Sequence, residues 1–399
     1  MQKQQEKTDV VVIGGGPAGL AAALSFEKQG LQVTVLDPAP ESVLANPTYD
    51  GRDIALTHHS VSLMQDMGVW QRIEKSEVAP LNQARVENGR DDHPLTFDTK
   101  GKGKDALGYL VSNHIIRKAL FEEVKTRTGI TVLCEDQNRH LHLCSDEVQV
   151  EHNGLPIRAQ LAVVADGRFS KTRESLGIGY LLHDFHRHML VCRMEHDLPH
   201  HEVALQWFDE GQTVALLPLN GGKSSVVLSL PPDEMDRVAA LDEEAFDQEI
   251  MRRVNHRLGN MHLISKRHVY PLKTIYANRF ETRHTALIGD TAVGMHPITA
   301  HGFNLGLIAQ DILSQEVAEG LARGEKLGSS KQLRRFERRL RTATLPLFSV
   351  TNGIATLYTR EETPFWHLRR AAMHAANSLK PVKNRVVNML MDKGVRSPL

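Results

Sequence analysis

The chain has 399 residues, of which 41% are hydrophobic and 24% are charged, and its formal net charge is zero. These values are typical of a folded globular protein of about two or three domains, and they exclude a disordered or collagen-like chain. No run approaches the roughly 18 consecutive apolar residues of a membrane-spanning helix, and the first residues are polar. The 3 cysteines are widely spaced, so the sequence favours a reduced, cytoplasmic environment.

The first forty residues contain a complete nucleotide-binding pattern. The apolar run 9–13 predicts a buried parallel strand, a glycine motif follows it, and then come a helix that Gly30 ends, a second strand over 32–36 and the acid Asp37. The motif consists of Gly14, Gly16, Pro17, Ala18 and Gly19. Its glycines allow a tight turn, close approach of a pyrophosphate and close packing of helix on strand. The pattern therefore predicts a dinucleotide whose pyrophosphate lies at the helix N-terminus, with Asp37 on a ribose.

Three predicted apolar strands end in acids. They are followed by Asp37, by Asp166 with Gly167, and by Gly289 with Asp290. In an open α/β sheet the ligand lies across the carboxyl ends of such strands. Three carboxylates suit a cofactor with several ribose or ribityl hydroxyls, which favours a flavin over nicotinamide as the resident cofactor.

The remaining pattern indicates an α/β fold with an insertion. Strands are predicted over 81–87 and 95–98. Alternating segments between about 179 and 270, the first of them over 189–194, predict an antiparallel sheet, and helices are predicted over about 242–257 and 302–322. We expect a Rossmann-like FAD-binding domain, an inserted antiparallel-sheet substrate domain and a C-terminal helical region. The boundaries predicted for these three parts are 1–78, 102–176 and 280–330 for the first, 79–101 and 177–279 for the second, and 331–399 for the third.

The C-terminal region is basic. From residue 331 to 399 there are 14 Lys and Arg residues against 4 Asp and Glu residues. This excess suggests an anionic partner surface, such as lipid headgroups or an acidic protein, and solvated helix faces explain it equally well. The arginine run 334–341 repeats at i, i+4 and matches no recognised nucleic-acid-binding fold, so nucleic acid is not expected.

Several motifs in order resemble the class A flavoprotein aromatic monooxygenases, and among them the ubiquinone-biosynthesis hydroxylases of the UbiH/UbiF/VisC type. The resemblance extends from residue 8 to about 375. Besides the glycine motif it is carried by Asp50–Leu56, Leu107–Asn113, Ala165–Arg173, Ala215–Leu219 and Gly289–Gly306. The stretch 294–304 is similar to the UbiM subgroup. Val293 and Ala300-His301 depart from the usual pattern of His and Gly-Gln, which leaves substrate and ring position open.

The resemblance implies bound FAD and NADH or NADPH as transient reductant. It places Gly14, Gly16 and Gly19 at the pyrophosphate and Asp37 at the adenosine ribose, and it gives Asp166 and Gly167 to both FAD and NAD(P)H. It includes Asn113 among the cofactor-binding residues, and it implies contacts of Arg52 near the flavin, Arg117 near the phosphates and Asp290 on the ribityl chain. Pro297 would lie beside the reactive edge of the flavin ring. The N–H groups of Gly302, Phe303 and Asn304 would begin a helix whose positive end stabilises the reduced flavin.

The implied activity is hydroxylation of a polyprenylated phenol or quinol with O₂, through a flavin C4a-hydroperoxide and without a metal. Pro297, His296 and His301 are the catalytic candidates. Either imidazole could activate a substrate phenol, because histidine titrates in the useful range, and either could equally only pack or bond the backbone. Apolar residues between 345 and 358 are expected to cover the entrance for a prenylated substrate.

Two alternatives remain at this point. The chain could be an FAD-dependent reductase or dehydrogenase of an isoprenoid or quinone on the same scaffold, or a non-catalytic, FAD-stabilised component of a lipid-pathway complex. The sequence does not decide the ring position, the choice between NADH and NADPH, or the oligomeric state. If the protein acts on a prenylated substrate, we expect it at the periphery of the inner face of the membrane.

Overall fold

The computed structural model describes residues 6–89, 94–99, 105–135, 140–209 and 211–359. The part of the predicted C-terminal helical region beyond residue 359 therefore lies outside the described residues. None of the described helices is long and apolar enough to cross a bilayer.

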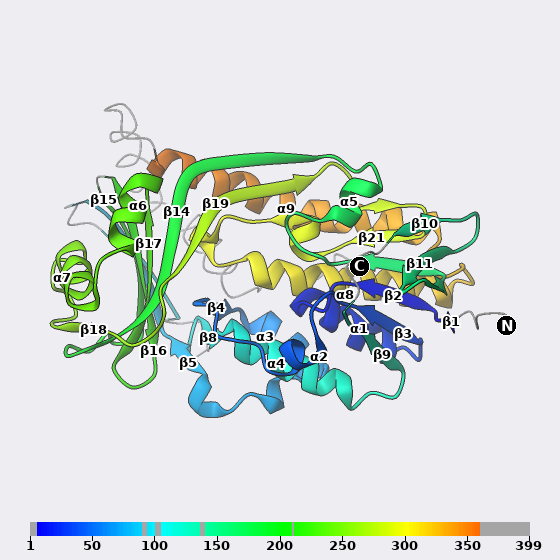
Figure 1. Ribbon diagram of the computed structural model, residues 1–399, viewed down its shortest axis with the longest axis horizontal. Coiled ribbons are helices and arrows are strands. Elements are labelled where there is room, and N and C mark those ends of the chain that lie inside the picture. The colour runs from blue at the N-terminus through cyan, green and yellow to red at the C-terminus, as the bar shows by residue number, and fades with distance from the viewer. Residues whose placement is uncertain (1–5, 90–93, 100–104, 136–139, 210, 360–399) are drawn as a thin grey trace.

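A parallel sheet lies at the centre of one half of the molecule (right in Figure 1). From one edge to the other its strands are β20 (Glu281–Thr282), β21 (Thr285–Leu287), β13 (Leu161–Val164), β2 (Val10–Ile13), β3 (Val33–Leu36) and β9 (Ile130–Leu133), with only β20 antiparallel to its neighbour. The strands predicted before Asp37, Asp166 and Asp290 are thus confirmed. Since β21, β13, β2 and β3 are parallel and adjacent, these three acids follow the same edge of the sheet.

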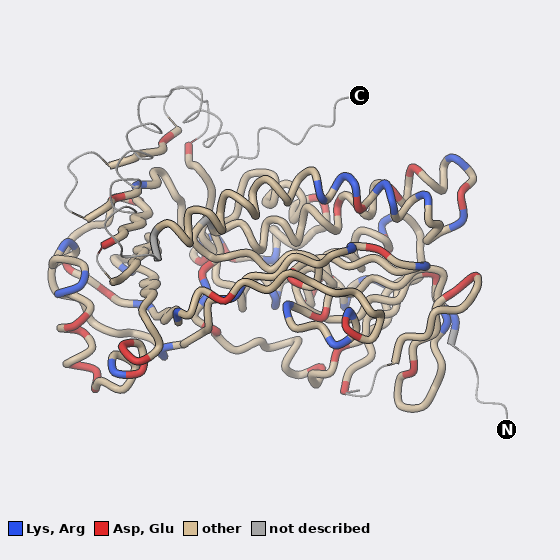
Figure 2. Tube along the Cα trace, turned by 90° about the horizontal axis from the view of Figure 1, so that it is seen from above, with Lys and Arg blue, Asp and Glu red and all other residues tan. Residues whose placement is uncertain are grey.

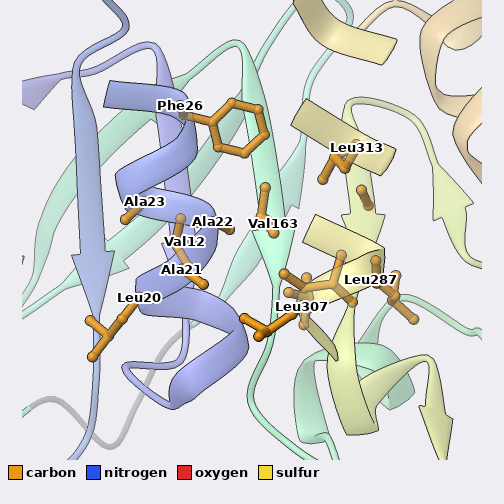
Figure 3. Packing of buried hydrophobic residues seen from close by; sticks show 14 of the residues in the cluster. Val12, Leu20, Ala21, Ala22, Ala23, Phe26, Val163, Leu287, Leu307 and Leu313 are labelled. Carbon is orange, nitrogen blue, oxygen red and sulfur yellow. The ribbon is translucent and has the colours of Figure 1, made fainter. Parts of the chain in front are cut away.

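Two helices cover this sheet and approach each other closely. α1 (Pro17–Glu27) carries small buried residues, and α8 (Gly302–Ala322) is buried along most of its length. Figure 3 shows their side chains meeting those of β2, β13 and β21. Ala18, in the first turn of α1, lies close to Gly289 and Gly306. A Cβ atom on Gly289 would be 3.0 Å from the Ala18 Cβ, and a Cβ atom on Gly306 would be 3.6 Å from it.

A large, mostly antiparallel sheet forms the other half of the molecule (left in Figure 1). Its strands are β22 (Val293–Gly294), β19 (His268–Ala277), β14 (Tyr180–His196), β17 (Lys223–Leu230), β16 (Gln212–Leu219), β15 (Val203–Asp209), β6 (Gln83–Asn88) and β7 (Leu95–Asp98), and β18 (Met261–Leu263) pairs with β14. α6 (Pro232–Ala239) and α7 (Glu243–Arg253) pack on one face. The opposite face carries the alternate residues, which include Met189, Arg193, Leu217 and Val227.

Two smaller sheets and short helices complete the fold. One sheet contains β4 (Asp53–Leu56), β8 (Gly108–Ser112) and β5 (Ala79–Leu81), and the other contains β1 (Glu6–Lys7), β12 (Leu155–Ala159), β11 (Val148–His152) and β10 (Leu141–Leu143). The remaining helices are α2 (Glu41–Ala45), α3 (His58–Asp66), α4 (Asn113–Lys125), α5 (Lys171–Ser175) and the 3₁₀ turns η1 (Trp70–Arg72), η2 (Lys75–Glu77), η3 (Gly289–Thr291) and η4 (Pro297–Thr299). The architecture is the predicted α/β class, while the predicted domain boundaries stay predictions.

Two segments differ from the expected strands. The expected strand 189–194 begins already at Tyr180, because residues 180–184 pair with β19 before a bulge interrupts the register. The expected segment 81–87 is divided at Asn82 between β5 and β6, which belong to different sheets, and the Asn82 N–H donates to the Glu202 carbonyl instead. The alternation of apolar and polar residues alone predicts neither the bulge in β14 nor the break between β5 and β6.

α9 (Ser330–Thr359) packs along α8. Several of its arginines form ion pairs with carboxylates of the same chain. Arg335 and Arg339 donate to the carboxylate of Glu316, which is buried, at 2.8 and 2.9 Å. Arg335 also pairs with Glu325, and Arg341 with Glu337. Figure 2 marks basic and acidic positions close together along these helices. Part of the excess that suggested an anionic partner is therefore neutralised inside the chain, while Lys331, Arg334 and Arg338 are exposed.

Candidate cofactor and active site

The glycine motif joins β2 to α1, and its members have different surroundings. Gly14 has φ +114°, and a Cβ there would lie 2.4 Å from the Ala165 carbonyl oxygen. A Cβ on Gly19 would lie 1.9 Å from the Gly14 carbonyl oxygen. Gly16, by contrast, has no described atom within 4 Å of its Cβ position. Gly14 and Gly19 thus shape the loop, and Gly16 faces open space.

This open space suits the pyrophosphate of a dinucleotide. Gly16 is the N-cap of α1 and Pro17 occupies its first position, so the first-turn N–H groups, which have no acceptor within a helix, point past the loop. A helix N-terminus with unbonded N–H groups favours an anion. The residues present therefore fit the phosphate part of FAD.

Asp37 is bound to the glycine loop itself. Its carboxylate accepts from the Gly15 N–H at 2.6 Å and from the Ala39 N–H at 2.9 Å. These bonds hold the end of β3 against the loop and fix the orientation of the carboxylate. The predicted contact with a ribose stays a prediction.

The strand end at Asp166 is tied to η3 by Thr291. The Gly167 N–H donates to the Thr291 Oγ1 at 2.9 Å, and that hydroxyl lies 3.3 Å from an Asp166 carboxylate oxygen. A Cβ on Gly167 would meet no described atom within 4 Å. The sequence did not single out Thr291, although it follows the acid Asp290 directly.

The sequence also missed the partner of Asp290. Arg168 donates to the Asp290 carboxylate from Nη2 at 2.9 Å and from Nε at 3.2 Å, and its Nη1 donates to the Lys273 carbonyl at 2.6 Å. Arg168 therefore orients the carboxylate that is predicted to bind the ribityl chain. Arg168 lies within one of the motifs of the resemblance, but no local spacing indicates that it reaches a residue 122 positions later.

Arg52 forms a polar cluster with Asp50 and Asn113. Its side chain, half-exposed, donates to the Asp50 carboxylate at 2.5 Å, and the Asn113 side-chain amide donates to the same oxygen at 2.7 Å. Burial alone would raise the pKa of Asp50, but the bonds from Arg52 and Asn113 and the charge of Arg52 outweigh it and hold that pKa below its ordinary value. Arg117 lies one turn after Asn113 on α4, on the same helix face.

The start of α8 is anchored to β4 by the Asn304 side chain. Its Oδ1 accepts from the Thr57 N–H at 3.1 Å, and its Nδ2 donates to the Ala55 carbonyl at 2.8 Å. The side-chain amide of Asn304 is therefore used inside the protein, and only its backbone N–H, with those of Gly302 and Phe303, is left for the predicted flavin contact. His301 is the buried N-cap residue of α8.

His296 and Pro297 precede this helix. Pro297 is exposed, whereas only 7% of His296 is exposed. The His296 Nδ1 accepts from the Ile298 N–H at 3.2 Å, and its ring meets the Phe185 ring edge-to-face at a centroid distance of 4.6 Å. Burial, with the nearby Arg168 and His183, lowers the pKa of His296 to about 4. The low pKa makes this imidazole a weaker base than an ordinary histidine, and a catalytic role for His296 stays a prediction.

We predict that His296 makes the protein sensitive to acid. The unfolded chain protonates this imidazole near its ordinary pKa of 6.5 and the folded chain only near 4, so the free energy of unfolding falls as the pH falls between these values. The expected contribution is a loss of about 2 kcal/mol between pH 7 and pH 5. Urea denaturation of the protein and of its His296→Asn variant at both pH values measures it. An equal loss in both proteins would contradict the prediction.

Comparison with known proteins agrees with this geometry. Residues 7–338 match the family model described as "FAD binding domain". The chain is 40% identical over 388 residues to ubiquinone hydroxylase UbiM of Neisseria meningitidis, covering 96% of this chain and 84% of the relative. It is 25% identical to 3-demethoxyubiquinol 3-hydroxylase of Escherichia coli, covering 96% of this chain and 98% of that one.

The fold is also that of solved enzymes. The crystal structure of p-nitrophenol 4-monooxygenase PnpA from Pseudomonas putida superposes with a TM-score of 0.79 at 18% identity, covering 98% of this chain and 100% of the other. The family model covers the glycine loop and all three aligned acids, and its description matches the predicted FAD. The relative at 40% identity is matched over most of its length. The chain belongs to the FAD-dependent monooxygenases, in the family that includes the ubiquinone hydroxylases.

Proposed function

We propose that this monooxygenase hydroxylates the ring of a polyprenylated phenol or quinol in ubiquinone biosynthesis, with NADH or NADPH as reductant. The names of its relatives support this substrate class, since those at 40% and 29% identity are both ubiquinone hydroxylases. In the structure it is supported best by half-buried apolar side chains near the start of α8, namely Ala55, Leu217 and Met189, which we call the apolar surface.

Two contacts, one made by Asn304 and one by His296, place this surface near the start of α8. On one side Asn304 of α8 holds β4, whose Ala55 packs with Leu217 of the large sheet around one small core cluster. On the other side His296 meets Phe185 of β14, against which Met189 packs. Apolar side chains of the large sheet therefore lie on both sides of the helix end at which the flavin ring is expected. A prenylated aromatic ring is apolar and fits such a surface.

FAD, when bound, takes electrons from the nicotinamide and activates O₂ for transfer of one oxygen atom to an electron-rich ring. The side chains and backbone groups of the protein would bind the cofactor and orient it. The loop at Gly16 and the first turn of α1 would hold the pyrophosphate, and Asp290, oriented by Arg168, would accept from ribityl hydroxyls. The N–H groups of Gly302 and Phe303 lie at the positive end of α8 and would stabilise negative charge on the ring. The apolar walls would exclude water.

We further propose that the exposed part of the C-terminal basic region faces an anionic surface, for which lipid headgroups are one source and acidic proteins of the pathway another. Lys331, Arg334 and Arg338 are exposed on α9, and so are the apolar Leu345 and Val350 of the same helix. Basic and apolar side chains together are typical of helices at membrane surfaces.

Complementation tests the proposed reaction. The gene is expressed in bacterial strains that each lack a single ring hydroxylase of ubiquinone synthesis, and the quinone intermediates are measured by mass spectrometry. We expect at least one strain to regain hydroxylated product, and the same strain to regain none with the Gly16→Val chain. Rescue of no ring position by a purified protein that still contains FAD and oxidises NADH or NADPH would contradict hydroxylation and favour a reductase.

A further inference from the structure

A surface cavity of about 410 Å³ lies between the turn that follows α5 and the segment that follows β19. The two segments are side by side (Figure 1), because Tyr180 of β14 pairs with Ala277 of β19 and the Asn278 N–H donates to the Gly179 carbonyl at 2.8 Å. Small-molecule sites have volumes of roughly 300 to 1,000 Å³. The lining includes none of the residues predicted to bind FAD, so this cavity is a separate candidate site.

The lining of the cavity combines an apolar part with polar side chains. Leu176 and the buried Ile178 form the apolar part. Between them Gly177 borders open space, since a Cβ on it would meet no described atom within 4 Å. The polar part consists of the side chains of Asn278, Arg279 and Thr282. The cavity can therefore hold a ligand that has both a polar head and a small organic group.

The polar side chains of the lining are free to bind a ligand. Within the described part of the chain, the Asn278 amide and the Thr282 hydroxyl make no hydrogen bond, and no carboxylate lies within ion-pair distance of the Arg279 guanidinium. All three side chains carry hydrogen-bond donors. A guanidinium presents several N–H groups in one plane, which suits the oxygens of a phosphate group. The set of donors therefore favours a ligand with several acceptor oxygens.

The charge around the cavity favours an anion. Arg279 is the one charged residue of the lining, and it acts together with Arg334 of α9 on the neighbouring Glu281. Burial and the charge of Glu337 raise the pKa of Glu281, and the two arginines oppose this rise. Glu337 itself forms an ion pair with Arg341 at 2.8 Å. The charges of Arg279 and Arg334 together thus outweigh that of Glu281, and a positive surface attracts anionic ligands.

We propose that this cavity binds a phosphate ester, either a small phosphorylated molecule or the headgroup of a phospholipid. The Arg279 guanidinium would pair with the phosphate oxygens, and the Thr282 hydroxyl and the Asn278 amide would donate to them. The attached organic group would lie on Leu176 and Ile178, because a phosphate ion alone fills only part of the volume. The site is separate from the FAD pyrophosphate and does not depend on the proposed hydroxylation.

The test uses the FAD-loaded protein, in which the cofactor's own phosphate position is already occupied. Binding of glycerol 3-phosphate is measured by calorimetry, and co-sedimentation is measured with phosphatidylcholine vesicles that contain or lack phosphatidylglycerol. Arg279→Gln removes the charge of the lining, and Thr282→Val removes the hydroxyl with little change of shape. Arg283→Gln is the matched control, since Arg283 is exposed nearby and does not line the cavity. Flavin absorbance checks that each variant is folded and loaded.

We expect Arg279→Gln to weaken binding about tenfold or more, Thr282→Val about threefold and Arg283→Gln less than about twofold. Binding of glycerol 3-phosphate supports a small phosphorylated ligand, and binding only of vesicles with phosphatidylglycerol supports a headgroup. Binding of neither probe would overturn the proposal. Equal binding by Arg279→Gln and Arg283→Gln would also overturn it, because the anion would then be attracted by the charge of the whole surface and not by the cavity.

Discussion

Replacing Gly16 with valine is expected to give a protein that folds but contains no FAD. The backbone of Gly16 is extended, with φ −76° and ψ 176°, and no described atom lies within 4 Å of its Cβ position, so the empty protein accommodates a side chain without strain. The valine methyl groups would fill the space predicted for the pyrophosphate, and we expect the Kd for FAD to rise by about 100-fold or more. The flavin absorbance of the purified protein and titration of the apoprotein with FAD measure the effect.

Two glycine variants serve as controls. In Gly19→Val the Cβ would lie 1.9 Å from the Gly14 carbonyl oxygen, so this chain is expected not to fold at all. In Gly353→Ala, on an exposed position of α9 with no atom within 4 Å of the Cβ, FAD content should be unchanged. A yellow, fully loaded Gly16→Val protein would show that the pyrophosphate does not lie at this loop.

Replacing Arg193 with methionine is expected to lower the free energy of unfolding by about 3 to 5 kcal/mol. Arg193 of β14 donates to both carboxylate oxygens of Asp53, at 2.5 and 3.3 Å, and the Asp53 side chain is 0% exposed. Without Arg193, the Ser112 hydroxyl, at 2.6 Å, is the one side-chain donor among the described residues that stabilises the charge of the buried Asp53 carboxylate. The variant therefore loosens the large sheet from β4.

Chemical denaturation of matched variants tests this explanation. Asp53→Asn combined with Arg193→Met leaves no buried charge and should regain much of the lost stability. Lys125→Met breaks the exposed pair of Lys125 with Glu41, whose side chains are 51% and 52% exposed, and should change stability by less than about 1 kcal/mol. An effect of Arg193→Met as small as that of Lys125→Met would contradict the importance assigned to the buried pair.

The parts of the fold that the sequence predicted are those with local signals. The strand, glycine loop and helix at 10–27 follow from apolar periodicity and turn chemistry within thirty residues, and the structure confirms them. Asp37, Asp166 and Asp290 were expected to converge because each ends an apolar strand, and parallel pairing does align those strand ends. The FAD assignment depended on that step.

The parts that the sequence could not predict depend on distant pairs. Arg168 and Asp290 are 122 positions apart and Arg193 and Asp53 are 140 apart, so neither pair has a spacing that periodicity reveals. The basic C-terminal region shows the same limit, because the carboxylate that receives Arg335 and Arg339 is on the preceding helix. His296 was found from its position beside Pro297, but its low pKa comes from burial, which no sequence pattern specifies.

The strand order of the parallel sheet has a consequence for synthesis of the protein. β2 lies between β13 and β3, and β13 lies between β2 and β21, which ends at residue 287. A nascent chain that has emerged only to residue 150 therefore exposes one hydrogen-bonding edge of β2, and its glycine loop lacks the backbone of Ala165 behind it. Pairings this distant in the chain fold slowly and expose strand edges meanwhile. The FAD site, although its fingerprint is translated first, is completed only when most of the chain has left the ribosome, and that interval is when the protein is most exposed to aggregation.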